Sequence, residues 1–184
     1  NGALPLPSLA LSGGTLNGSG NVTLTGSGST WSGGTMSGSG TLIIATGAVY
    51  TKTSNSVTTL SMATTNAGLI TASAGTLTIQ GVTVTNTGGT IEASTASIVQ
   101  INTGTTIVGG TLNTVGTGKV FLQGSSTLSN VSNNGQLEIP DNQTGLLSGT
   151  FTNNGNLLLA STGSGVDLRI SGNVTLAGTG SVTL

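Results

Sequence analysis

Residues 132–159 read SNNGQLEIPDNQTGLLSGTFTNNGNLLL, and this stretch contains one phrase twice. The phrase is Asn-Asn-Gly, a polar residue and then alternating apolar positions. Its two glycines, Gly135 and Gly155, are 155 − 135 = 20 residues apart. An earlier phrase, SGGT, starts at Ser12 and again at Ser32, which is also 32 − 12 = 20 residues. A repeat of this length, built from a turn and a short strand, is typical of one coil of a solenoid.

The register of the coils can be followed through the apolar residue that opens the first strand after each turn. From residue 67 onward these marker residues are separated by 21, 21, 25, 20 and 25 positions: Ile70, Ile91, Leu112, Leu137, Leu157 and Val182. Each interval holds two more short alternating segments, and residues 52–66 have no clear register. The pattern predicts an all-β parallel β-helix, or β-solenoid, with three short strands per coil and about eight coils of 20–25 residues. The intervals of 25 predict extra residues at a corner, and a closed antiparallel barrel or sandwich is the alternative fold.

The composition excludes several classes of protein. Only 4% of the 184 residues are charged, against roughly 25% in an average domain, and His and Cys are absent. A net charge of −1 does not indicate the basic surface that binding to nucleic acid requires. No apolar run approaches the roughly 20 residues of a membrane-spanning helix, so membrane insertion is not expected. With only four aromatic residues, the core is predicted to be thin and aliphatic.

The first eleven residues, NGALPLPSLAL, differ from the rest. Proline cannot donate to a sheet ladder, so residues 1–11 are predicted to be an extended arm or lead-in strand, followed by a solenoid domain over residues 12–184. Apolar residues near both ends are candidate assembly surfaces: Leu4, Leu6, Leu9, Leu11, Val182 and Leu184. Stacking of the two Asn-Asn-Gly phrases would also place Asn134 over Asn154, as an amide ladder at one corner.

Two further phrases resemble those of a known group of proteins. STWSGGTMSGSGT at 29–41 and GNVTL at 172–176 are similar to segments of large repetitive bacterial surface and secreted proteins, the autotransporter-passenger-like and filamentous-haemagglutinin-like adhesins. The resemblance covers nearly the whole chain and is largely compositional. It implies a right-handed parallel β-helix, secreted or on the cell surface, and it carries over no catalytic residues.

The residues themselves indicate no catalytic chemistry. A Ser or Thr nucleophile needs a base, and no His is present to supply one. Zinc sites in their usual forms need His or Cys. The cluster around Asp141 reads as a polar turn rather than a calcium site. We therefore expect no enzyme activity, no cofactor and no metal.

The carboxylates do not form a convincing glycosidase pair. Asp141 and Asp167 are expected on different faces of neighbouring coils. Glu92 and Glu138 each follow a marker residue, which places them in one outward row with Asn113 between them. That row is interpreted as a solvated face rather than as the acid and base of a glycosidase.

Three functions compete at this point. The first is a non-catalytic structural or adhesive rod of an extracellular bacterial fibre or adhesin. The second is a self-assembling filament subunit that polymerises end to end through uncapped coils and the N-terminal arm. The partners are accordingly copies of the chain or the remainder of a longer repeat chain, with glycans as a further candidate. Ice binding, which would need a regular threonine ladder, is a remote third, because the equivalents of Thr78 and Thr83 in later coils include Gln100 and Arg169.

Overall fold

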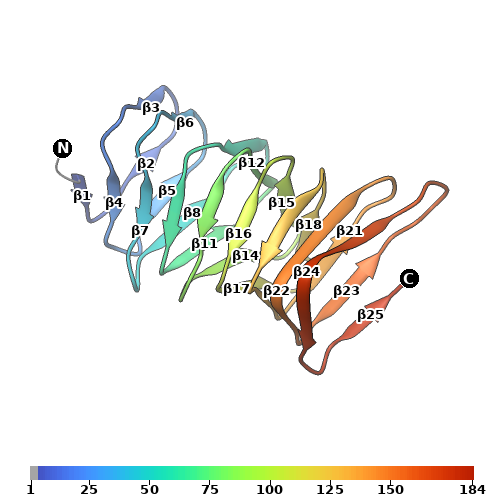
Figure 1. Ribbon diagram of the computed structural model, residues 1–184. Coiled ribbons are helices and arrows are strands. Elements are labelled where there is room, and N and C mark those ends of the chain that lie inside the picture. The colour runs from blue at the N-terminus through green and yellow to red at the C-terminus, as the bar shows by residue number, and fades with distance from the viewer. Residues whose placement is uncertain (1–3) are drawn as a thin grey trace.

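The computed structural model describes residues 4–184, which form an all-β parallel solenoid of about nine coils without any helix (Figure 1). Each strand pairs in parallel with the equivalent strand one coil away, never with its neighbour in sequence. The short alternating segments form strands because one face of each is apolar and turns inward. The predicted fold class is therefore confirmed.

The strands lie on three faces, which we call A, B and C. Face A contains β1 (Leu4–Leu6), β4 (Val22–Leu24), β7 (Leu42–Ile44), β10 (Thr64–Asn66), β13 (Thr83–Thr85), β16 (Thr106–Val108) and β19 (Ser126–Ser129). Face B contains β2 (Ala10–Leu11), β5 (Ser29–Trp31), β8 (Val49–Lys52), β11 (Leu69–Ala72), β14 (Thr90–Ala93), β17 (Thr111–Thr114) and β20 (Ser132–Asn133). Face C contains β3 (Thr15–Asn17), β6 (Thr35–Ser37), β9 (Val57–Leu60), β12 (Thr76–Gln80), β15 (Ile98–Asn102), β18 (Lys119–Leu122), β21 (Gln136–Ile139), β23 (Asn156–Leu159) and β25 (Ser181–Thr183).

Two longer strands run along face A and continue onto face B. They are β22 (Thr144–Asn153) and β24 (Asp167–Ala177). The first part of β22 pairs with β19 and its last residues pair with β20. Gly149 lies at the corner between these parts, with a φ of +68° that favours glycine. Faces A and B therefore form one continuous hydrogen-bonded sheet at this end of the column.

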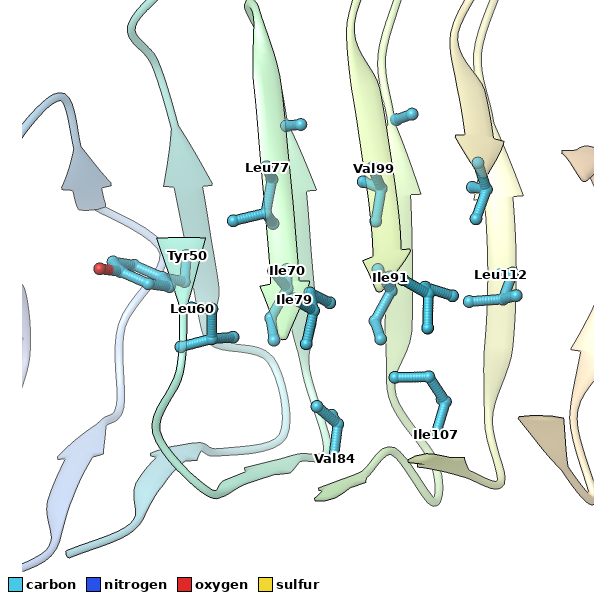
Figure 2. Close-up of a cluster of buried hydrophobic side chains, with 14 of the residues drawn as sticks. Tyr50, Leu60, Ile70, Leu77, Ile79, Val84, Ile91, Val99, Ile107 and Leu112 are labelled. Atoms are coloured by element: carbon cyan, nitrogen blue, oxygen red, sulfur yellow. The ribbon is translucent and has the colours of Figure 1, made fainter. Parts of the chain in front are cut away.

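The core is a set of aliphatic ladders along the solenoid axis. On face B, Ile70 pairs with Ile91, and Ile91 with Leu112. On face C, Leu60 pairs with Ile79, and Ile79 with Ile101. These residues are 0–1% exposed, and Figure 2 shows many of them side by side between the faces. At about 4.8 Å per coil, nine coils span roughly 38 Å.

The N-terminal coils depart from this aliphatic pattern. The rings of Trp31 and Tyr50 stack with centroids 5.9 Å apart and planes inclined by 15°. Met36 and Met62 are also buried in this part of the chain. On face C, β3 and β6 form a separate two-stranded sheet that does not pair with β9. Bulky side chains thus fill the coils in which face C is interrupted.

The structure corrects the predicted register in one coil. Leu112 stacks on Asn133, not on Leu137, and Leu137 stacks on Val120 on face C. The cause is a shorter corner between faces B and C: it takes 120 − 112 = 8 positions from Leu112 to Val120, but 137 − 133 = 4 from Asn133 to Leu137. The interval of 25 between Leu112 and Leu137 therefore does not reflect extra residues at a corner. It arises because Leu137 lies on face C rather than face B, after a corner that is shorter than in the preceding coil.

The other interval of 25, between Leu157 and Val182, is correctly placed, because these two residues do stack. Its extra residues lie in the exposed segment 161–165 and at a register shift where Ser148 pairs with Ser171 but Gly149 pairs with Val174. The number of coils is about nine rather than eight. The additional coil arises because residues 4–11 already form β1 and β2, which pair with β4 and β5.

Candidate functional surfaces

The apolar residues near the start of the chain are only partly available at the surface. Leu4 is 53% exposed on β1. Leu6 and Leu9 are half-buried against the core, and Leu11 is buried. Residues 1–3 of the predicted arm lie outside the described residues. The N-terminal end therefore presents one prominent leucine on an edge strand.

The C-terminal end is open and apolar. A hollow of about 260 Å³ lies there, lined by Phe151, Leu157, Leu168, Leu176 and Val182 among others. Inward-facing positions become exposed in the last coil because no further coil covers them within the described residues. Leu147, for example, is fully buried, whereas its partner Ile170 is 53% exposed. Leu184 is 93% exposed.

The two Asn-Asn-Gly phrases form two different ladders at one corner. On the outside, Asn154 Nδ2 donates to Asn134 Oδ1 at 3.1 Å, where the corner ladder was expected. On the inside, Asn133 Nδ2 donates to Asn153 Oδ1 at 2.8 Å. Asn133 Oδ1 also accepts the Gly135 main-chain N–H at 3.2 Å. Asn133 is 1% exposed. The outer pair was predicted from the sequence, whereas the buried pair was not.

A second buried asparagine pair lies at the corner between faces A and B. Asn66 Nδ2 donates to Asn86 Oδ1 at 2.6 Å and to the Thr90 carbonyl at 3.0 Å. Gly68 N–H in turn donates to Asn66 Oδ1 at 3.2 Å. Both asparagines are fully buried. The shared spacing, Asn-x-Gly with a second Asn twenty residues later, was the signal from which this pair could have been found.

The two glutamates do not share a row, which corrects the expectation from sequence. Glu92 lies on face B, where it accepts hydrogen bonds from Thr71 Oγ1 at 3.3 Å and Asn113 Nδ2 at 2.8 Å. Glu138 lies on face C, where it forms an ion pair with Lys119 at 2.9 Å. The error follows from the register slip at Leu137. The carboxylates are thus separated on different faces, each held by its own partners.

The two aspartates have separate roles near the C-terminal end. Asp141 Oδ1 accepts the main-chain N–H of Thr162 at 3.0 Å and that of Ser164 at 3.1 Å. These hydrogen bonds, that of Thr162 first, lower the pKa of Asp141. Asp167 forms an ion pair with Arg169 at 3.0 Å, and both side chains are more than half exposed. An exposed pair of this kind contributes little to stability.

Lys52 is an ionisable residue whose position could not be predicted from the sequence. It is 2% exposed at the end of β8 and occupies the same inward row as Trp31. Its ammonium group donates to the main-chain carbonyls of Ser54, Ser56 and Ala74. Burial lowers the pKa of Lys52 below that of an ordinary lysine. The irregular stretch after β8 is therefore organised around this side chain.

The threonines considered for ice binding lie on different faces. Thr78 is on face C and is paired with Gln100. Thr83 is on face A, where it stacks on Thr106, and Thr106 stacks on Thr127. The row then passes through Leu146 to Arg169. The threonine ladder therefore extends over three coils of face A before it ends.

Within residues 4–184, no three His, Cys, Asp or Glu side chains lie close enough together to hold a metal ion. The same residues contain no helix that is long and apolar enough to cross a membrane.

In comparisons with known proteins, the chain matched no protein-family model, no curated protein sequence and no solved structure. Apart from the apolar hollow at the C-terminal end, its surfaces mainly offer hydrogen bonding from hydroxyl and amide groups.

Proposed function

We propose that the chain is a stiff, non-catalytic rod segment of an extracellular bacterial fibre or adhesin. The observation that carries this proposal is the uninterrupted parallel pairing along faces A and B, from β1 and β2 to β24. A column in which every coil is hydrogen-bonded to the next on two faces resists bending. The repetitive composition supports the extracellular setting.

The outer surface suits contact with uncharged partners. The exposed residues are mainly Ser, Thr, Asn and Gly, and only seven charged residues occur in the whole chain. Binding to neutral glycans would therefore depend on hydrogen bonds and hardly at all on long-range attraction. Such binding should persist when the ionic strength is raised, because screening weakens only charge-based contacts.

A second candidate, a filament subunit that stacks end to end, is favoured by the exposed apolar interior at the C-terminal end. A further coil, from a second copy or from the same polypeptide, would cover the hollow beside Leu176. It would also pair with the free edge of β24. Leu4 and Ile170 are the first and last residues of one row along face A. Leu4 of the incoming copy would therefore stack on Ile170 and continue that row.

Electron microscopy of the purified chain at micromolar concentration separates the two candidates. Separate short rods support the rod segment, and a subsequent glycan-binding assay at low and high salt tests adhesion. Long fibres with an axial repeat close to one subunit support the filament. In that case Leu176→Lys should abolish the fibres, whereas Val115→Lys, at an exposed position away from the ends, should leave them intact. Globular particles would contradict both candidates.

A further inference from the structure

The buried ammonium of Lys52 has no anionic partner. Within residues 4–184, the ion pairs involve Lys119 and Arg169 instead. A lysine is almost never fully buried unless its charge is compensated. The Lys52 side chain is nevertheless directed inward between Trp31 and Ala72, its neighbours in the adjacent coils. Its compensation must therefore come from the main chain.

Three main-chain carbonyls provide that compensation. The Lys52 Nζ donates to Ser56 O at 2.6 Å, to Ala74 O at 2.5 Å and, in a short contact, to Ser54 O. An ammonium group has three N–H donors and no acceptor. Within residues 4–184, none of these three carbonyls accepts another hydrogen bond from the main chain. Donors and acceptors therefore match one to one.

The surrounding backbone is shaped to leave room for the ammonium group. Gly75 has a φ of +58°, and a Cβ added to it would lie 2.7 Å from Lys52 Nζ and 2.4 Å from Asn55 O. Any other residue at this position would thus intrude on the ammonium and on the loop that it holds. Gly75 and Lys52, which lie in two successive coils, therefore depend on each other: the absence of a side chain at Gly75 leaves the space that the ammonium group of Lys52 occupies.

Other corners place a neutral hydroxyl group beside carbonyls that already accept a main-chain N–H, such as Ala72 O from Ser94 and Ser94 O from Ser97. Ser97 Oγ lies 2.6 Å from Ala72 O and 2.8 Å from Ser94 O, and its one O–H can donate to either carbonyl. Ser126 is placed in the same way between two carbonyls at a later corner. At the corner after β8, a cation lies within hydrogen-bond distance of three carbonyls, whereas the hydroxyl groups at these other corners are each close to two.

We propose that the carbonyls of Ser54, Ser56 and Ala74 form a binding site for a primary ammonium ion, which Lys52 occupies as a tethered structural cation. Ser56 also lines a groove of about 380 Å³ between β6 and β9. When the lysine is truncated, the site takes up a free alkylammonium ion of matching length.

The test is chemical rescue of Lys52→Ala, which removes Cγ, Cδ, Cε and Nζ, by n-propylammonium chloride. We expect the substitution to lower Tm by about 5–10 °C, because three main-chain carbonyls lose their donor. We expect n-propylammonium to restore most of this loss in a saturable manner. Tetramethylammonium, which has no N–H, and sodium chloride at equal ionic strength should restore none. Ser97→Ala serves as the matched control, because its Tm should not respond to n-propylammonium.

An unchanged Tm in Lys52→Ala, or equal recovery with all three salts, would overturn the proposal. If the variant does not fold, reductive methylation of the native chain decides the question. Lys119, whose side chain is 44% exposed, should be modified, while Lys52 should remain unmodified until denaturant is added. Equal modification of the two lysines in the native state would also refute the ammonium site.

Discussion

Asn133 and Asn153 lie one above the other inside the solenoid, joined by a hydrogen bond of 2.8 Å between their amide groups. Each asparagine occupies an inward position that holds an aliphatic residue in earlier coils, since Asn133 stacks on Leu112. A buried amide is tolerated only when its polar atoms have partners. In residues 4–184, no buried side-chain nitrogen or oxygen lacks one.

The first prediction compares neighbouring asparagines with opposite orientations. Asn133→Ala should lower the free energy of unfolding by about 2–3 kcal/mol, because it leaves the Gly135 N–H and the amide of Asn153 without their buried partner. Asn134→Ala removes the exposed outer hydrogen bond and should cost no more than about 0.5 kcal/mol. Urea denaturation of both variants measures the difference, and equal losses would contradict it.

A second prediction concerns Tyr50, the only tyrosine of the chain. Its hydroxyl donates to Met36 Sδ at 3.0 Å, and burial raises its pKa well above the ordinary value. Above pH of about 10 the unfolded chain loses this proton while the folded chain keeps it. The unfolded state then binds fewer protons, so the free energy of unfolding should fall with rising pH by about 1.4 kcal/mol per unit.

Tyr50→Phe isolates this contribution, because it removes the ionisable group and retains the ring that stacks on Trp31. The stability of the variant should lack the alkaline decrease attributed to Tyr50. In the wild type, phenolate absorbance should appear only together with unfolding. Ionisation of Tyr50 near pH 10 in a chain that remains folded would show that the hydroxyl is not buried as described.

A third prediction uses two glycines with similar backbone angles and different surroundings. Gly47 has a φ of +77° with nothing within 4 Å of an added Cβ, whereas the added Cβ at Gly75 meets Asn55 O at 2.4 Å. Gly47→Ala should therefore cost about 1 kcal/mol for its backbone angle alone. Gly75→Ala should cost about 2–4 kcal/mol, since steric conflict is added. Thermal unfolding compares the two, and the idea fails if Gly47→Ala is the more damaging.

The fourth prediction is a gradient of amide hydrogen exchange along the solenoid. Among the strands of the described residues, β21 is paired on both sides, by β18 and β23, whereas β25 is paired only by β23. Below the concentration at which any fibres form, the amides of β25 should exchange much faster than those of β21. Local openings begin where few buried contacts hold the backbone. Uniform protection along face C would indicate that another chain covers the C-terminal end.

The class of fold and the length of its repeat could be predicted because both depend on local patterns. Alternating residues such as Leu157 and Leu159 indicate a strand, and Gly135 and Gly155 indicate the period. The register across a shortened corner could not be predicted, because Leu137 looks the same whether it continues face B or begins face C. Lys52 was missed for a related reason: its acceptors are main-chain carbonyls, which leave no signature in the sequence.

The two described ends of the chain lie at opposite ends of the column (Figure 1). The hydrogen bonds between coils run along the solenoid axis, so tension applied at both ends would stretch them along their length. The terminal coil has a neighbouring coil on one side only, so its bonds would break first and the chain would peel from its end. Each released coil of about 20 residues would add roughly 60 Å of slack. The molecule would thus yield to a sustained pull in small steps, dissipating work that would otherwise break the attachment at either end.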